Sequence, residues 1–346
     1  MSTSPDLVAL LEHAYRLDVD DSAWLDGVVR ASTPMLERGM GVFGFLYETM
    51  NVTSWSLGQV VNVGAPPEVP EILREVAPQS PPEMTRRFFW SSPCITVLDL
   101  LGAGPGADSL RNVMAPYGAE DVLMIKAADP TGVALSLCAP LKKHVAVGRP
   151  TTALWSRLCA HLAAAHRLRR VLRSVPAGMD FTGAEAVLSP AGKCEHAVGP
   201  AQERDALATL RTAAVQMDRA RGGLRRKDPD AALDLWRGLV AGRWSLLDQF
   251  DTDGRRYLVA RRNDPQTPDP RALTERERQV AHFVAMGHTN KLVAYELGLS
   301  EGSVATHLRR GIAKLGVGSR VQLAERFHQL GGTAKAPGAE PLNSSS

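Results

Sequence analysis

The chain has 346 residues, with 40 Lys and Arg against 37 Asp and Glu and a formal net charge of +3. This length predicts two or three domains, and 44% hydrophobic residues suffice for buried cores. The longest nearly uninterrupted apolar run, residues 132–141, is about half of the ~20 residues that a membrane span needs. The N-terminus carries Asp6 and no basic flank, unlike a secretory signal. The four cysteines form no Cys-x-x-Cys pair, which argues against a disulfide scaffold or a zinc finger. We therefore expect a soluble, cytoplasmic protein.

The basic charge is concentrated near the C-terminus. Residues 271–331 hold nine Lys and Arg against five Asp and Glu, a net charge of +4, and the remainder is close to neutral. This is the pattern of a chain in which one small module contacts a polyanion.

The first block, residues 1–175, reads as an α+β domain. Apolar periodicity predicts helices over 7–17 and 24–36, then strands over 42–47 and 55–63, and two shorter helices over 68–76 and 83–89. Strands over 121–126 and 133–138 flank the turn sequence Ala-Ala-Asp-Pro-Thr-Gly, and a long helix over 152–173 follows. This order of helix, hairpin, helices, hairpin and exit helix resembles a GAF-like sensor domain.

The second block, residues 176–263, begins with a hairpin over 186–197. Helices over 202–221 and 230–239 follow, and a second hairpin comprises strands 244–250 and 256–261 around an Asp-Gly turn. Its order of elements resembles a compact PAS-like α+β module. The next segment, residues 264–270, is rich in proline and reads as a linker.

The third block, residues 271–331, has the clearest local signals. Thr274 and Glu277 have the spacing of a capping box, Gly287 can end the first helix, and Ser300 can cap a later one. That later helix has an apolar seam at residues 304, 308, 312 and 315, and no acidic residue occurs between Gly302 and Arg320. The pattern fits a helix-turn-helix whose second helix enters the major groove, and it also fits a small helical bundle packed on the sensor. Residues 332–346 read as a disordered tail.

Specific residues in this block resemble the LuxR-type DNA-binding domain, a four-helix helix-turn-helix module. The matches extend over about 60 residues and are Leu273, Thr274, Glu277, Gly287, Asn290, Lys291, Ala294, Leu297, Ser300, Val304, His307, Lys314, Leu315, Val317, Arg320 and Leu323. The expected fold is therefore multi-domain, with a GAF-like and PAS-like α+β sensor region before an all-α helix-turn-helix domain. The expected function is sequence-specific, sensor-controlled transcription regulation.

The resemblance also implies which residues meet DNA. Ala305, Thr306 and Arg309 would approach base edges, and Arg309 suits a bidentate contact with guanine. Those near phosphates would be Asn290, Lys291, Ser303, His307, Arg310 and Lys314. The family often has lysine at the positions of Gly302 and Ala305, so this chain lacks two cations, which predicts weaker or more dimer-dependent binding.

The expected partners are double-stranded DNA, a second copy of the chain, a small-molecule effector and RNA polymerase; no membrane or cofactor is expected. An apolar or aromatic effector could lie among Phe43, Phe45, Tyr47, Trp55, Leu123 and Leu137, unless these residues are ordinary core. A stripe at residues 154, 158, 162, 165 and 168 of the long helix could form the dimer seam or close the chain's own core.

Two weaker patterns suggest other chemistry. Residues 95–107 run from an apolar segment into a Gly-x-Gly-x-x-Ala pattern at 102–107, which resembles a dinucleotide-binding loop and is the basis of the enzyme alternative. Cys194 and His196 have a spacing that could ligate a metal, but no further ligands cluster nearby, so no metal site and no catalytic residue are predicted.

Overall fold

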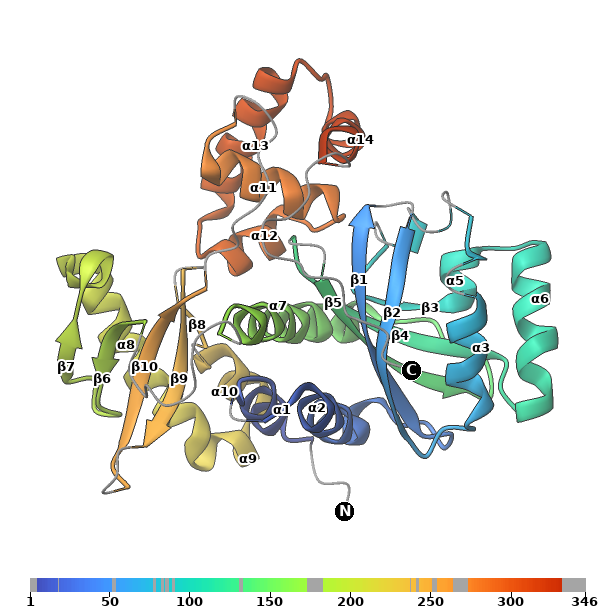
Figure 1. The fold of residues 1–346 in the computed structure, drawn as a ribbon, viewed down its shortest axis with the longest axis horizontal. Helices are drawn as coiled ribbons and strands as arrows, with labels where there is room; N and C mark the ends of the chain where they lie inside the picture. Colours follow the sequence, from blue (N-terminus) through green and yellow to red (C-terminus); the bar gives the residue numbers. More distant parts are fainter. Residues whose placement is uncertain are drawn as a thin grey trace, which may run out of the picture.

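A computed structural model gives the fold (Figure 1). It describes residues 5–17, 19–51, 54–76, 79–81, 84, 87–88, 91–130, 133–172, 183–236, 238–240, 243–250, 254–263 and 273–331. The expected linker 264–270 and the expected tail 332–346 therefore lie outside the described residues. We call residues 5–263 the two-sheet region and residues 273–331 the C-terminal helical domain.

The two-sheet region contains helices, short helical turns and ten strands among its described residues. The helices are α1 (Leu7–Ala14), α2 (Asp21–Leu36), α3 (Glu68–Val76), α5 (Val97–Leu101), α6 (Pro105–Met114), α7 (Arg149–Leu172), α8 (Arg204–Arg219), α9 (Arg225–Lys227) and α10 (Pro229–Leu235), with turns η2 (Ala115–Tyr117), η3 (Gly199–Gln202) and η4 (Ala220–Leu224). The strands are β1 (Val42–Asn51), β2 (Ser54–Val63), β3 (Cys94–Thr96), β4 (Asp121–Ala128), β5 (Val133–Leu141), β6 (Ala184–Leu188), β7 (Cys194–Ala197), β8 (Leu239–Val240), β9 (Trp244–Phe250) and β10 (Arg256–Arg262).

The strands form two five-stranded sheets with the same order. The first sheet runs β2-β1-β5-β4-β3 and the second runs β7-β6-β10-β9-β8, so each has the order second, first, fifth, fourth, third. All named strand pairs are antiparallel. The central strand β5 is buried at every position, as expected for a strand covered on both faces. The sequence shows no internal repeat, so the common order is visible only in the structure.

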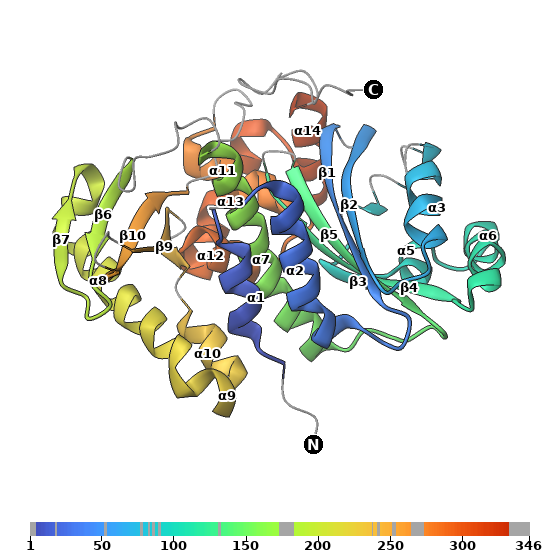
Figure 2. The same cartoon turned by 60° about the horizontal axis from the view of Figure 1, so that its bottom comes forward.

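Helix α7 lies between the two sheets, with α1 and α2 beside it (Figures 1 and 2). Half of its residues are buried, including charged Arg169, because protein surrounds the helix on several sides. The stripe considered as a dimer seam is part of this burial: Leu158, Leu162 and Ala165 are fully inaccessible within one chain. The seam hypothesis for this stripe is therefore wrong, and the stripe closes the chain's own core.

One hydrophobic core joins both sheets. It extends from Leu7 of α1 through Leu137 of the first sheet to Ala260 of the second. A smaller core lies on the other face of the first sheet, beneath α3, α5 and α6. The described parts of the expected GAF-like and PAS-like modules thus share a core, and the boundary at 175/176, which falls outside the described residues, stays a prediction.

The residues proposed to line an effector pocket do not share one face of the first sheet. Phe43, Phe45 and Tyr47 belong to the smaller core, whereas Leu123 and Leu137 face the large one. Successive strand residues point to opposite faces, which explains the division. The expectation of one pocket lined by this set is therefore wrong; the side chain of Trp55 lies outside the described residues.

Most expected elements of the two-sheet region occur near their predicted positions, but several bounds differ; the helix expected over 7–17, for example, ends at Ala14. The helix expected over 230–239 ends at Leu235, because Trp236 adopts extended geometry and residues 239–240 pair with β9. The helix expected from residue 202 begins at Arg204, after the turn η3. The helix expected over 83–89 lies largely outside the described residues.

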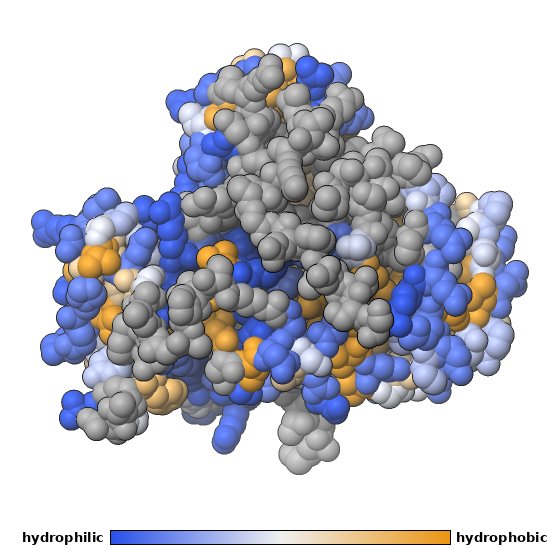
Figure 3. Space-filling view, in the orientation of Figure 1, coloured by the Kyte–Doolittle hydropathy of each residue, from blue (hydrophilic) through white to orange (hydrophobic). Residues whose placement is uncertain are grey.

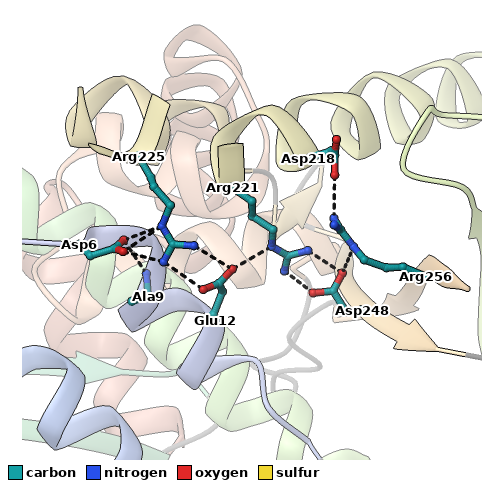
Figure 4. Close-up of polar contacts among 8 residues, drawn as sticks. All are labelled: Asp6, Ala9, Glu12, Asp218, Arg221, Arg225, Asp248 and Arg256. Carbon is teal, nitrogen blue, oxygen red and sulfur yellow. Dashed lines mark hydrogen bonds and ion pairs between the residues drawn. The ribbon is translucent and has the colours of Figure 1, made fainter. Parts of the chain in front are cut away.

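A chain of ion pairs fastens α1 to the second sheet (Figure 4). Arg225 contacts Asp6 at 2.7 Å and Glu12 at 3.2 Å. Arg221 contacts Glu12 at 3.1 Å and also pairs with Asp248 of β9. Arg256 of β10 extends the chain, with 3.0 Å to Asp248 and 3.1 Å to Asp218. Because α1 belongs to the first block, these contacts hold the two halves of the region together.

Candidate nucleic-acid interface

Local capping signals define the C-terminal helical domain, whose described helices are α11 (Glu275–Ala285), α12 (Asn290–Leu297), α13 (Glu301–Leu315) and α14 (Arg320–Gly331). Thr274 and Glu277 form the predicted capping box, with the Glu277 amide donating to Thr274 Oγ1 at 3.4 Å and the Thr274 amide donating to Glu277 Oε2 at 2.9 Å. Gly287 has a φ of 82°, which favours glycine after α11.

The remaining helices also begin at side-chain caps. Thr289 accepts a hydrogen bond from the Leu292 amide at 3.3 Å, and Ser300 accepts one from the Ser303 amide at 3.0 Å. The predicted cap at Ser300 is confirmed, and it fixes where α13 starts.

Helix α13 uses one side for the core and leaves the other outward. Val304 is fully buried, while Leu308, Ile312 and Leu315 are partly buried and pack against the same core. The seam predicted from the i, i+4 spacing is therefore present. Gly311 is also buried on this helix.

The residues expected to contact DNA lie outside that seam. Arg309, Arg310 and Lys314 are exposed on α13, and Lys291 is exposed at the start of α12. The other candidates are half-buried: Asn290 on α12, and Ser303, Ala305, Thr306 and His307 on α13. A short helix, a tight turn and a second helix with outward cations reproduce the expected helix-turn-helix arrangement.

Comparison with known proteins identifies this segment. Residues 271–327 match the family model described as bacterial regulatory proteins, luxR family. This segment is a luxR-family domain. It covers less than a fifth of the chain, and we keep the family name for the segment alone.

Curated relatives are similar to part of the chain. The transcriptional regulatory protein UhpA of Salmonella typhimurium is 46% identical over 70 residues, which is 20% of this chain and 32% of the relative. The nitrate/nitrite response regulator protein NarP of Escherichia coli is 36% identical over 110 residues, 32% of this chain and 49% of the relative. The chain thus spans about a third of the first of these two relatives and about half of the second. Among solved structures, Escherichia coli SdiA aligns over 92% of this chain and 94% of its own, with 11% identity and a TM-score of 0.29, too low to support a common arrangement.

Lys314 and Asn290, two of the DNA-contact candidates, also make contacts between helices of the luxR-family domain. Lys314 Nζ donates to Glu277 Oε2 at 2.7 Å, and Arg320 donates to Asn290 Oδ1 at 2.6 Å. Burial alone would raise the pKa of the Glu277 carboxyl, but hydrogen bonds from Lys314 and Thr274 outweigh it and hold that pKa below its ordinary value. Lys314 therefore fastens α13 to the capping box of α11, a role that the sequence did not reveal.

The luxR-family domain is docked on the two-sheet region through residues that sequence reasoning missed. Tyr295 Oη of α12 is 2.8 Å from His161 Nε2 of α7, and His161 Nδ1 is 3.2 Å from Tyr15 Oη. His282 Nδ1 of α11 donates to the Pro130 carbonyl at 3.0 Å. These contacts involve α11 and α12, and the outward cations of α13 take no part in them. A tyrosine or histidine on a helix gives no sequence signal of its partner in another domain.

The glycine pattern at 102–107 lies in a different setting from a dinucleotide-binding loop. Gly102 and Gly104, with φ of 72° and 140°, join the short helices α5 and α6. A dinucleotide loop instead connects a parallel strand directly to a helix, and the sheet here pairs antiparallel throughout its described strands. The glycine pattern therefore does not have the setting that the enzyme alternative requires.

The cysteines and the Cys194 and His196 pair are the other candidate groups. Within the described ranges, no cluster of three or more His, Cys, Asp or Glu residues is placed to hold a metal ion, and this includes Cys194 and His196. Cys94 and Cys138 are buried and unpaired, and burial raises the pKa of the Cys94 thiol to about 12. No described helix is long and apolar enough to cross a bilayer.

Proposed function

We propose that the whole chain is a sequence-specific DNA-binding transcription regulator in which the two-sheet region controls the luxR-family domain. One observation supports this most strongly: α13 presents exposed Arg309 and Arg310 beside a buried seam, within a segment that matches a family of bacterial regulators. The absence of acidic residues between 302 and 320 keeps this surface attractive to phosphate.

In this proposal the two arginines have different roles. Arg309 reads a guanine edge in the major groove, with Ala305 and Thr306 beside it. The hydroxyl of Thr306 already donates to the Gly302 carbonyl at 2.9 Å, so it is left as an acceptor for a base. Arg310 binds phosphate together with Lys291, and the other phosphate contacts come from Asn290, Ser303, His307 and Lys314.

Binding of the full-length protein to duplex DNA, measured by fluorescence anisotropy at several salt concentrations, tests these roles. Arg309→Ala should cost roughly 1–3 kcal/mol on a selected site and little on random duplex. Arg310→Ala should weaken both duplexes and reduce the salt slope by about 1. Arg226→Ala, on exposed α9, is the matched control and should change neither. Wild-type binding by both α13 variants on both duplexes would contradict the assignment.

The two-sheet region is the sensor in this proposal, with GAF-like and PAS-like modules. The identical strand order of the two sheets supports two modules of one kind. The working form in this proposal is a cytoplasmic homodimer. One small module that lacks the lysines often found at the positions of Gly302 and Ala305 makes few DNA contacts, so two copies would bind together. RNA polymerase is a further proposed partner. Sedimentation of the full chain with and without a two-half-site duplex tests the dimer, and a monomer that binds one half-site tightly would refute it.

A further inference from the structure

Among the described residues, the hydrogen-bond partners of the buried Lys126 ammonium are all neutral. Lys126 lies on β4, faces the smaller core and is 6% exposed. Its ammonium donates to the Phe88 carbonyl, to the Ser91 carbonyl at 3.3 Å and to Ser91 Oγ, and it lies 4.7 Å from the centre of the Phe88 ring. A buried charge without a counter-ion is costly, and a bound anion would remove that cost.

Lys126 lines a small pocket where the two-sheet region meets the luxR-family domain. Tyr47 and Ser91 contribute from the first sheet side, and Met286 and His288 contribute from the segment between α11 and α12. One domain therefore supplies the cation, and the other closes the pocket.

The closing segment is connected to residues proposed to contact DNA. The His288 carbonyl accepts a hydrogen bond from Arg320, and the same guanidinium donates to Asn290 at 2.6 Å. Asn290 is the first residue of α12, and Lys291 follows it. A shift of His288 would therefore move the Arg320 contact and the start of α12 together.

We propose that this pocket binds a small organic monocarboxylate, which pairs with Lys126 and displaces residues 286–290 so that DNA affinity changes. The coupling to DNA rests on the proposed function, whereas carboxylate binding does not. The described pocket offers one lysine, which balances one negative charge, and a dianionic phosphate would need a second cation. Pro93, Ala128 and Met286 provide apolar lining, but the closed pocket has room for only about one water molecule, so a carboxylate enters only with the displacement of residues 286–290.

The titration of Lys126 supports a site for an anion. Burial lowers the pKa of Lys126 to about 7. Among the described residues, the titratable or charged groups facing it are Tyr47 on β1, Cys159 on α7, and His288 with its partner Glu296 at 3.2 Å. Burial raises the pKa of both Tyr47 and Cys159, so these two groups stay neutral near pH 7. Carboxylate binding should therefore weaken as the pH rises above about 7, because Lys126 loses its proton.

Isothermal titration of the full-length protein with sodium acetate, propionate or benzoate tests the site directly, with sodium chloride and inorganic phosphate as comparisons. At least one carboxylate should bind saturably, and Lys126→Met should lower its affinity at least about tenfold. Lys143→Met, at an exposed lysine, is the matched control and should bind as the wild type does. Circular dichroism should show that Lys126→Met folds.

Several results would overturn the proposal. The proposal is wrong if the wild type binds no carboxylate, or if Lys126→Met binds carboxylate as tightly as the wild type does. It is also wrong if phosphate binds in place of carboxylate and its binding depends on Lys126. If Lys126→Met misfolds, the conservative variant Lys126→Arg replaces it, and a lack of carboxylate binding by that variant contradicts the proposal. Anisotropy then separates the two claims. Carboxylate binding without any change in DNA affinity refutes the coupling, whereas carboxylate binding by a protein that never binds DNA refutes the proposed function and leaves the site standing.

Discussion

The two-sheet region and the luxR-family domain are stabilised in different ways. The region's large core contains residues from Leu7 to Ala260, and its ion pairs join residues as distant as Asp6 and Arg225. The domain has a separate core between Leu273 and Ala324, and local caps start its helices at Thr274, Thr289 and Ser300. A fold held by local signals can be recognised from a short stretch of sequence, whereas one held by distant contacts cannot.

The surfaces of the two parts also differ. In the described residues, large exposed hydrophobic side chains occur singly on both parts, for example Phe250 of β9 and Val321 of α14. In Figure 3 the flank over β7 and α8 and the flank over α3 and α6 show mainly hydrophilic residues, with scattered hydrophobic ones among them. The cationic helix α13 is therefore the surface feature that distinguishes the domain from the two-sheet region. The two parts differ further in how their cores are packed.

The largest expected difference comes from the cores. Phe45→Ala, at a fully buried position of β1, should destabilise the protein by about 3–5 kcal/mol, because it removes a ring and leaves a cavity. Leu308→Ala, at a partly buried position of α13, should cost about 1–2 kcal/mol. All six tryptophans lie within the first 244 residues, so their fluorescence in urea follows the two-sheet region alone. The expectation is wrong if the two variants lose equal stability, with the opening of α13 followed by amide exchange.

The ion-pair chain should give the next largest effect. Arg221 is 13% exposed, contacts Glu12 and Asp248, and lies over the Trp236 ring at 4.7 Å. Arg221→Met should lower the unfolding free energy by about 2 kcal/mol, and less in high salt. The exposed pair Arg30–Asp26 is the control, and Arg30→Met should leave the urea midpoint unchanged. A similar, small effect of both variants would show that α1 is held by apolar packing alone.

The capping box of α11 should have a smaller effect. Thr274→Ala removes the capping box of α11 and should cost about 1 kcal/mol, detected as faster amide exchange in α11. Thr209→Ala, at an exposed mid-helix position of α8, is the control and should not destabilise the protein. Unchanged exchange in Thr274→Ala would mean that tertiary packing fixes the start of α11.

The smallest effect is a gain. Gly311 is buried in α13, and a Cβ there would meet Leu323 Cδ1 at 3.7 Å, an ordinary contact. Gly311→Ala should therefore stabilise the domain by about 0.5–1 kcal/mol through helix propensity. Slower amide exchange in α13 would confirm this, and faster exchange would show that the seam has no room for a methyl group.

The difference between the parts also explains what could be predicted. Thr274 with Glu277, Gly287 and Ser300 act within a few residues, so their roles were readable from spacing. The hairpins were readable for the same reason. The common strand order and the burial of α7 on both sides depend on contacts between residues far apart in the sequence, which periodicity does not encode.

The candidate site was predictable on its outward face only. Arg309 and Arg310 are exposed on α13, as the pattern predicts. The hydrogen bonds of Lys314 with Glu277 and of Asn290 with Arg320 were not predictable, because each depends on how the helices pack. The docking pair Tyr295 and His161 left no signal. Lys126 did leave a signal in the sequence, because it is a lone lysine among the apolar residues 122–128. A charged residue in such a strand indicates either the edge of a sheet or a binding site.

The central claim is that α13 reads DNA sequence for the whole chain. Selection of binding sites from a random duplex library by the full-length protein tests it most directly. The account predicts one enriched motif for the wild type and loss of preference at a single guanine for Arg309→Ala, with the flanking positions retained. A wild-type protein that enriches no motif, or an Arg309→Ala protein that selects the unchanged motif, would contradict it.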